Sequence, residues 1–301
     1  MAKRVLLFVT VNILVVLTLS IAMQLLGVQP YLSARGINYQ SLAVFCLIWG
    51  MGGAFISLGI SRITAKWMMG VKIIDPASAQ GELGELVRTV HRLAQAAGIE
   101  TMPEVGYYDS PEINAFATGP TRNRALVAVS TGLLTRLTRE QVEGVLGHEV
   151  AHIANGDMVT MTLVQGIINA FVMFLARIAG FIVSQRFRAE SRRMVNMVTV
   201  LVLEIALSIL GTFVTAWFSR RREFRADAGG ANLAGREKML SALKALKRTA
   251  ELAAPDNHPS LATLKISGRR AGFMALLSTH PPIEVRIEAL MRLESEAVRY
   301  R

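Results

Sequence analysis

Two histidines and a glutamate within residues 148–152 form the pattern in this chain best suited to chemistry. His148 and His152 are four positions apart, so on a helix both imidazoles lie on one face, about 6 Å apart along the axis. Two imidazoles in that arrangement can bind one zinc ion, and Glu149 beside them can take a proton from a water that the zinc activates. The alternative, a coincidental pair of surface histidines, is disfavoured because the chain has only five histidines.

A zinc site that does chemistry needs a third protein ligand and an open fourth position. Glu223 and Asp227 are also four positions apart, and they share one face of a predicted helix that follows the last apolar run. One carboxylate can bind the metal while the other accepts the N–H of a ligand histidine, and the spacing does not decide which does which. Without the histidine motif, the two would be interpreted as part of a solvated, arginine-rich helix.

A capped helix is predicted to carry the histidine motif. Thr138 and Gln141 have the spacing of a capping box, and Asn155-Gly156 is a helix stop, so we expect the helix to end near Ala154. The flanking polar regions predict further short elements. These are helices over 79–97, 236–251 and 282–298, strands over 105–108, 114–118 and 125–130, and a loop that contains His258 and His280.

Long apolar runs indicate an integral membrane protein. The chain is 52% hydrophobic and 18% charged, against the roughly 25% charged residues usual for a soluble protein. Residues 5–29 and 41–60 carry no charged side chain, and either run can cross a hydrocarbon core as a helix of about 20 residues. The first run is too long for the apolar part of a signal peptide, so we interpret it as an uncleaved anchor.

The positions of the basic residues predict the orientation. Lys3 and Arg4 precede the first run, and Arg62 and Lys66 follow the second, which places both ends of this hairpin in the cytoplasm. The net charge of +11 therefore belongs to the borders of apolar runs and does not indicate a nucleic-acid partner. The one cysteine, Cys46, excludes an internal disulfide.

A second apolar pair covers residues 158–185 and 194–219, and each run is interrupted by one charge, Arg177 or Glu204. The pair lies between the histidine motif and Glu223, so the chain must return to the side that it left. We predict a spanning hairpin in which Arg177 and Glu204 form a contact, since pairing relieves the cost of each charge in the bilayer. The alternative is two helices on the membrane surface with both charges in water.

Several further motifs, together with the histidine motif and the Glu223/Asp227 pair, give the chain a family resemblance. They are residues 114–119, 156–162, 219–227 and 279–282. Over nearly its whole length the chain resembles the HtpX-type bacterial membrane zinc metalloproteases, which are gluzincins. It is more distantly similar to the CAAX-processing membrane zinc proteases.

The resemblance implies a role for each site residue. It implies one zinc ion per chain bound by His148, His152 and Glu223, with Glu149 as the general base and Asp227 as an outer partner of the site. It implies that Asn114, Ala115, Phe116 and Ala117 form an edge strand on which a substrate peptide lies, and that His280 and Arg286 stabilise the oxyanion. The alternatives are that His280 is a turn residue and that Arg286 is an ordinary salt-bridge partner.

The expected fold is mainly α, an integral membrane protein with a cytoplasmic α+β zincin-like catalytic domain built on a small antiparallel sheet. We expect a transmembrane hairpin over 1–60, catalytic regions over 61–157 and 220–301, and the second apolar hairpin over 158–219. The expected location is the bacterial inner membrane.

The expected activity is that of a zinc endopeptidase that degrades misfolded or damaged membrane proteins. A non-catalytic scaffold with structural zinc is the alternative, but such sites usually have four His or Cys ligands. An intramembrane protease is disfavoured, because charged residues such as Arg139, Glu140 and Glu143 lie on the motif helix.

Overall fold

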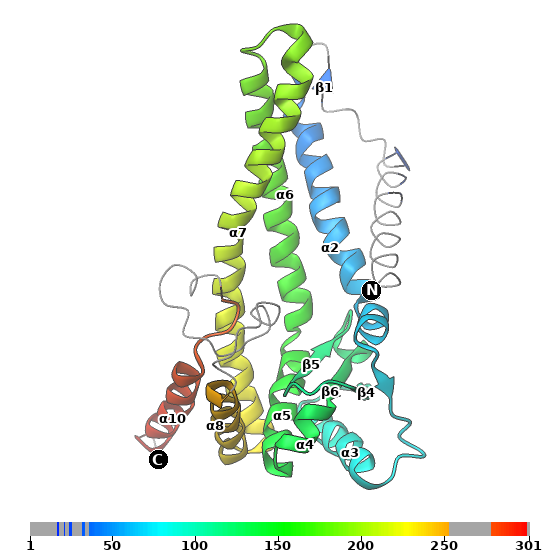
Figure 1. Ribbon diagram of the computed structural model, residues 1–301, viewed down its shortest axis with the longest axis vertical. Coiled ribbons are helices and arrows are strands. Elements are labelled where there is room, and N and C mark those ends of the chain that lie inside the picture. Colours follow the sequence, from blue (N-terminus) through cyan, green and yellow to red (C-terminus); the bar gives the residue numbers. More distant parts are fainter. Residues whose placement is uncertain are drawn as a thin grey trace. The chain divides into compact units, whose positions relative to one another are not determined.

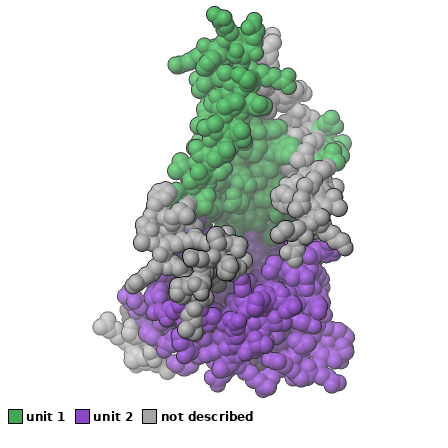
Figure 2. Space-filling view, viewed as in Figure 1, with its two compact units in different colours: residues 1–59, 160–215 green, residues 60–159, 216–301 purple. Residues whose placement is uncertain are grey.

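The computed structural model describes residues 36–252 and 278–299, together with residues 17, 21, 24, 25, 32 and 33 (Figure 1). It divides into two compact units, residues 1–59 with 160–215 and residues 60–159 with 216–301 (Figure 2). The predicted apolar anchor over 5–29 lies almost wholly outside the described residues, as does the part of the predicted loop that contains His258.

Three helices among the described residues are long and apolar enough to cross a membrane. They are α2 (Tyr39–Met69), α6 (Asp157–Ser184) and α7 (Ala189–Ala234). Each exceeds the roughly 20 residues that a 30 Å hydrocarbon core requires. Before α2, the two-residue strands β1 (Leu32–Ser33) and β2 (Gly36–Ile37) pair antiparallel.

An ion pair joins α6 to α7 inside the first unit. Arg177 Nη1 lies 2.7 Å from Glu204 Oε1, which confirms the predicted contact. The Arg177 guanidinium also lies over the ring of Phe45 on α2, 5.3 Å from its centroid. The Arg177 guanidinium is therefore held by a carboxylate and an aromatic face. Both partners lower the cost of a charge among apolar helices.

A four-stranded sheet lies in the second unit, in the order β3-β4-β6-β5. Its strands are β3 (Lys72–Ile73), β4 (Glu104–Tyr108), β5 (Ala115–Thr118) and β6 (Leu126–Ser130). The sheet is mixed and not wholly antiparallel as predicted, because β4 and β6 run parallel. Every residue of β6 is buried, and this apolar strand takes a central position, while the half-buried β5 pairs antiparallel with it as an edge strand.

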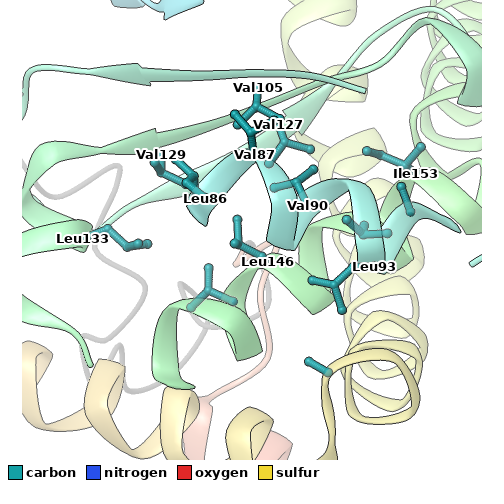
Figure 3. Packing of buried hydrophobic residues seen from close by; sticks show 14 of the residues in the cluster. Leu86, Val87, Val90, Leu93, Val105, Val127, Val129, Leu133, Leu146 and Ile153 are labelled. Atoms are coloured by element: carbon teal, nitrogen blue, oxygen red, sulfur yellow. The ribbon is translucent and has the colours of Figure 1, made fainter. Parts of the chain in front are cut away.

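Helices cover one face of this sheet and form the main core (Figure 3). Val127 and Val129 of β6 pack with Val90 of α3 (Gly81–Ala96) and Leu146 of α5 (Arg139–Asn155). The remaining helices of this unit are short α4 (Thr131–Arg136), α8 (Arg236–Leu252), α10 (Ile283–Arg299) and the 3₁₀ turn Arg122–Arg124. The helices and strands predicted for the polar regions therefore exist, with bounds shifted by one or two residues.

Candidate metal centre

Helix α5 carries the histidine motif, and local sequence determines where it begins and ends. Thr138 Oγ1 accepts a hydrogen bond from the Gln141 backbone N–H, and Gln141 Oε1 accepts one from the Thr138 N–H, which is the predicted capping box. At the other end Gly156 adopts a left-handed conformation with φ of 67°, which glycine allows without a steric penalty. The motif is thus held in a helix with both ends defined.

The two motif histidines direct their Nε2 atoms toward one point. These atoms are 3.0 Å apart, while His148 Nδ1 lies 2.9 Å from Asp227 and His152 Nδ1 lies 2.6 Å from Asp157. A carboxylate at each Nδ1 favours the tautomer that carries its proton there. In that tautomer both Nε2 lone pairs face each other, an arrangement that suits a shared metal cation.

Glu223 on α7 completes this group. Its Oε1 lies 3.3 Å from His152 Nε2 and its Oε2 lies 3.6 Å from His148 Nε2. The side chain is 1% exposed, and neither carboxylate oxygen has a hydrogen-bond partner among the described residues. Two facing imidazole nitrogens and a buried carboxylate are a ligand set that fits zinc.

Asp227 lies one turn beyond Glu223 on α7 and has different contacts. It accepts two hydrogen bonds from Arg286, at 2.8 Å from Nε and 2.6 Å from Nη2, and it contacts His148 Nδ1. Burial alone would raise the pKa of Asp227, but its contacts with Arg286 and His148 outweigh burial and lower that pKa. Asp227 therefore stays ionised, and it contacts His148 directly and Glu223 through Arg286.

Asp157 is a site residue that the sequence predictions missed. It is the first residue of α6, it is 1% exposed, and its contact with His152 Nδ1 mirrors that of Asp227 with His148. Its second oxygen lies 3.7 Å from Arg225 Nη2. The available signal was an aspartate directly after the glycine that ends the motif helix, five positions beyond His152.

A cavity of about 300 Å³ opens beside this group. The predicted substrate strand lines it with Asn114, Ala115, Phe116 and Ala117, of which Ala115–Ala117 belong to edge strand β5. Glu149, the predicted base, lines it from α5 and is only partly buried. The apolar side chains around it come from α4, α5 and α8, and they include Leu133, Val145, Met239, Leu243 and Leu246.

His280 and Arg286 also line this cavity, but their surroundings differ. His280 Nδ1 lies 2.9 Å from Glu223 Oε2, and 40% of its side chain is exposed. The Arg286 side chain is 5% exposed and faces carboxylates, with Nη1 3.5 Å from Glu223 Oε2 and the other two nitrogens on Asp227. The structure thus places every sequence-predicted site residue around one cavity or one contact beyond it.

Comparison with known proteins agrees with this geometry. The profile of Peptidase family M48 matches residues 81–294. The chain belongs to peptidase family M48. Proteins named "Protease HtpX homolog" are 49% identical to it in Methylacidiphilum infernorum and in Bacillus subtilis, over 97% and 96% of this chain and 99% of each relative.

A solved structure shows the same fold for this M48 chain. The crystal structure of Ste24p from S. mikatae superimposes with a TM-score of 0.58 at 17% identity, covering 96% of this chain and 66% of that one. The family, the relatives and three helices long and apolar enough to cross a membrane together identify this M48 chain as a membrane metalloprotease.

Proposed function

We propose that this protein is a zinc-dependent endopeptidase whose active site is the cavity between β5 and the histidine motif. The observation that supports this most directly is the pair of facing Nε2 atoms 3.0 Å apart beside the buried Glu223 carboxylate. A site with three protein ligands leaves a position for water or substrate, as catalytic zinc sites do. Glu149 lines the same cavity as these three residues.

We assign metal binding, proton transfer and orientation of the histidines to different residues of the site. His148, His152 and Glu223 would hold the zinc, which when bound would polarise the attacking water and the scissile carbonyl. Glu149 accepts a proton from the attacking water and later delivers it to the leaving amine nitrogen. Asp157 and Asp227 orient the two histidines through Nδ1.

His280, rather than Arg286, is the group we assign to the carbonyl oxygen of the substrate. It is partly exposed to the cavity, and a donor there stabilises the charge that develops on this oxygen. Arg286 donates two hydrogen bonds to Asp227, so it is a positioning residue that acts through Asp227 on His148.

The substrate that fits is an extended stretch of polypeptide. Strand β5 is an edge strand, and a peptide that pairs with Asn114–Ala117 is bound through main-chain hydrogen bonds that do not depend on its sequence. Such recognition suits misfolded or damaged membrane proteins at an inner membrane. The basic residues that flank the first hairpin favour a cytoplasmic active site.

A structural zinc site in a non-catalytic scaffold is the less favoured reading. Such sites usually have four His or Cys ligands. Among the described residues only His148, His152 and Glu223 form a group that could hold a metal ion. A scaffold would not need a cavity lined by a carboxylate such as Glu149 beside these three residues.

The test is cleavage of unfolded casein by the detergent-solubilised protein with added zinc. Glu149→Gln keeps the ligand set and removes the base, so we expect full zinc content by elemental analysis and a loss of cleavage of at least about 10²–10⁴-fold. Normal turnover by this variant would refute the mechanism.

A further inference from the structure

Arg222 borders the group formed by His148, His152 and Glu223 at a different atom from His280. The two oxygens of Glu223 separate these neighbours, because Oε2 lies 2.9 Å from His280 Nδ1 whereas Oε1 lies 3.6 Å from Arg222 Nη2. Both residues line the cavity that β5 borders. A peptide that passes the metal ligands along β5 would therefore meet His280 and Arg222 at different atoms.

The Arg222 guanidinium has hydrogen-bonding capacity to spare. Its distance from Glu223 is too long for a hydrogen bond, and its Nε is buried with no hydrogen-bond partner among the described residues. Only 22% of the side chain is exposed. Arg286, the other arginine that lines the cavity, has two of its nitrogens bonded to Asp227.

An extended peptide in this cavity has main-chain carbonyl groups that need hydrogen-bond donors. Pairing with β5 uses the N–H and C=O groups along one edge of the peptide, while those along the other edge face the cavity walls. A carbonyl buried there without a donor is costly. A guanidinium beside the metal-ligand group can supply that donor, and every peptide offers the acceptor regardless of its sequence.

We propose that Arg222 binds the substrate by donating a hydrogen bond to a main-chain carbonyl oxygen on the peptide edge that does not pair with β5. The acceptor belongs to a residue near the scissile bond. It is a different carbonyl from the scissile one, which His280 contacts. Arg222 is thus a substrate-binding residue, and the ligand class is an extended peptide main chain. This inference rests on the proposed function.

The experiment measures peptide binding separately from cleavage. A fluorescein-labelled, unstructured casein peptide is titrated by anisotropy against the zinc-loaded Glu149→Gln protein, with and without Arg222→Ala. We expect Arg222→Ala to weaken binding about 10- to 100-fold, as for a lost hydrogen bond from a charged group. Zinc content and melting temperature should not change, and Arg222→Lys should retain part of the affinity.

Arg221→Ala is the matched control. Arg221 is the neighbouring arginine, but its guanidinium lies over the Trp217 ring, 4.6 Å from the centroid, and it is not among the residues that line the cavity. Its loss should leave peptide affinity unchanged. If Arg222→Ala lowers the melting temperature, Arg222→Gln, which keeps most of the side-chain volume, replaces it in the same measurement.

A peptide series with one carbonyl at a time converted to a thiocarbonyl, a weaker acceptor, locates the contact. One position should weaken binding to the protein with Arg222 and have no effect on the Arg222→Ala protein. Equal affinity with and without Arg222 would overturn the inference, as would loss of zinc from Arg222→Ala, which would make Arg222 a positioning residue for Glu223. Failure of the unsubstituted protein, which keeps Glu149, to cleave casein would instead overturn the proposed function.

Discussion

Each histidine of the motif depends on a carboxylate from another helix. Asp157 comes from the start of α6 and Asp227 from the C-terminal turns of α7, and both are nearly fully buried. Each carboxylate favours a proton on the Nδ1 that it contacts, which would leave the Nε2 lone pair available to a metal ion. The ligand set is therefore held by contacts that are spread over three helices.

The two acidic residues of α7 should respond differently to substitution. Glu223→Ala removes a ligand and should abolish zinc binding, whereas Asp227→Ala removes only a partner of His148 and should weaken binding by roughly 10–100-fold. Elemental analysis of both purified proteins decides. A metal-free Asp227→Ala beside a metal-replete Glu223→Ala would show that the two roles are reversed.

Asp157 should behave like Asp227. Asp157→Ala removes the acceptor at His152 Nδ1, so we expect zinc affinity to fall by about 10–100-fold, with a smaller fall for Asp157→Asn, which keeps an oxygen. Competition with a zinc chelator measures the affinity. Glu140→Gln, an exposed change on the motif helix, is the control, and an Asp157→Ala protein equal to it in affinity would rule out this role.

At the scale of elements, close approach of helices holds the motif in place. A Cβ added at Gly144 on α5 would lie 2.5 Å from the Lys238 carbonyl oxygen on α8. The same helix meets α7 where a Cβ on Gly230 would lie 2.9 Å from the His148 backbone nitrogen. Small residues at these crossings let three helices approach the metal-ligand group together.

Gly144→Ala should therefore destabilise the catalytic unit. The added methyl group meets backbone rather than a movable side chain, so we expect a loss of about 1–3 kcal/mol in the free energy of unfolding. Thermal unfolding in detergent, compared with Glu140→Ala on the exposed side of α5, measures the effect. An unchanged melting temperature would mean that α5 and α8 are less tightly packed than the structure shows.

For the whole molecule, the second apolar pair separates the two halves of the metal-ligand group along the chain. α6 begins at Asp157, beside His152, and α7 reaches Glu223 and Asp227 without a break after its apolar part. The partly buried Arg177–Glu204 pair joins the same two helices within their apolar part, where an unpaired charge would oppose insertion. We therefore expect α6 and α7 to cross the bilayer as a hairpin.

Chemical labelling tests this topology. In a Cys46→Ala background, single cysteines replace Phe187, Arg188 or Glu190, three residues exposed between or at the ends of α6 and α7. Each should react with a membrane-impermeant maleimide in cells whose inner membrane is intact. Protection in intact cells with labelling only after lysis would instead show that the helices do not span.

Sequence alone was sufficient wherever the determining interactions are local. The capping box of α5, its glycine stop and the i, i+4 spacing of His148 and His152 act within a few residues, and they were predicted correctly. The apolar length of α2, α6 and α7 reflects a requirement of the bilayer and needs no tertiary contact. Even the Arg177–Glu204 contact was predicted from sequence, because pairing lowers the cost of two charges in one apolar hairpin.

Tertiary structure decided what depends on how one element is rotated against another. Spacing puts Glu223 and Asp227 on one face of α7, but only the packing of Gly230 against His148 aims Glu223 at the two Nε2 atoms and leaves Asp227 to Nδ1 and Arg286. The parallel pairing of β4 with β6 likewise depends on which strand takes the centre of the sheet. Such choices are made by contacts between residues far apart along the chain, which no local spacing encodes.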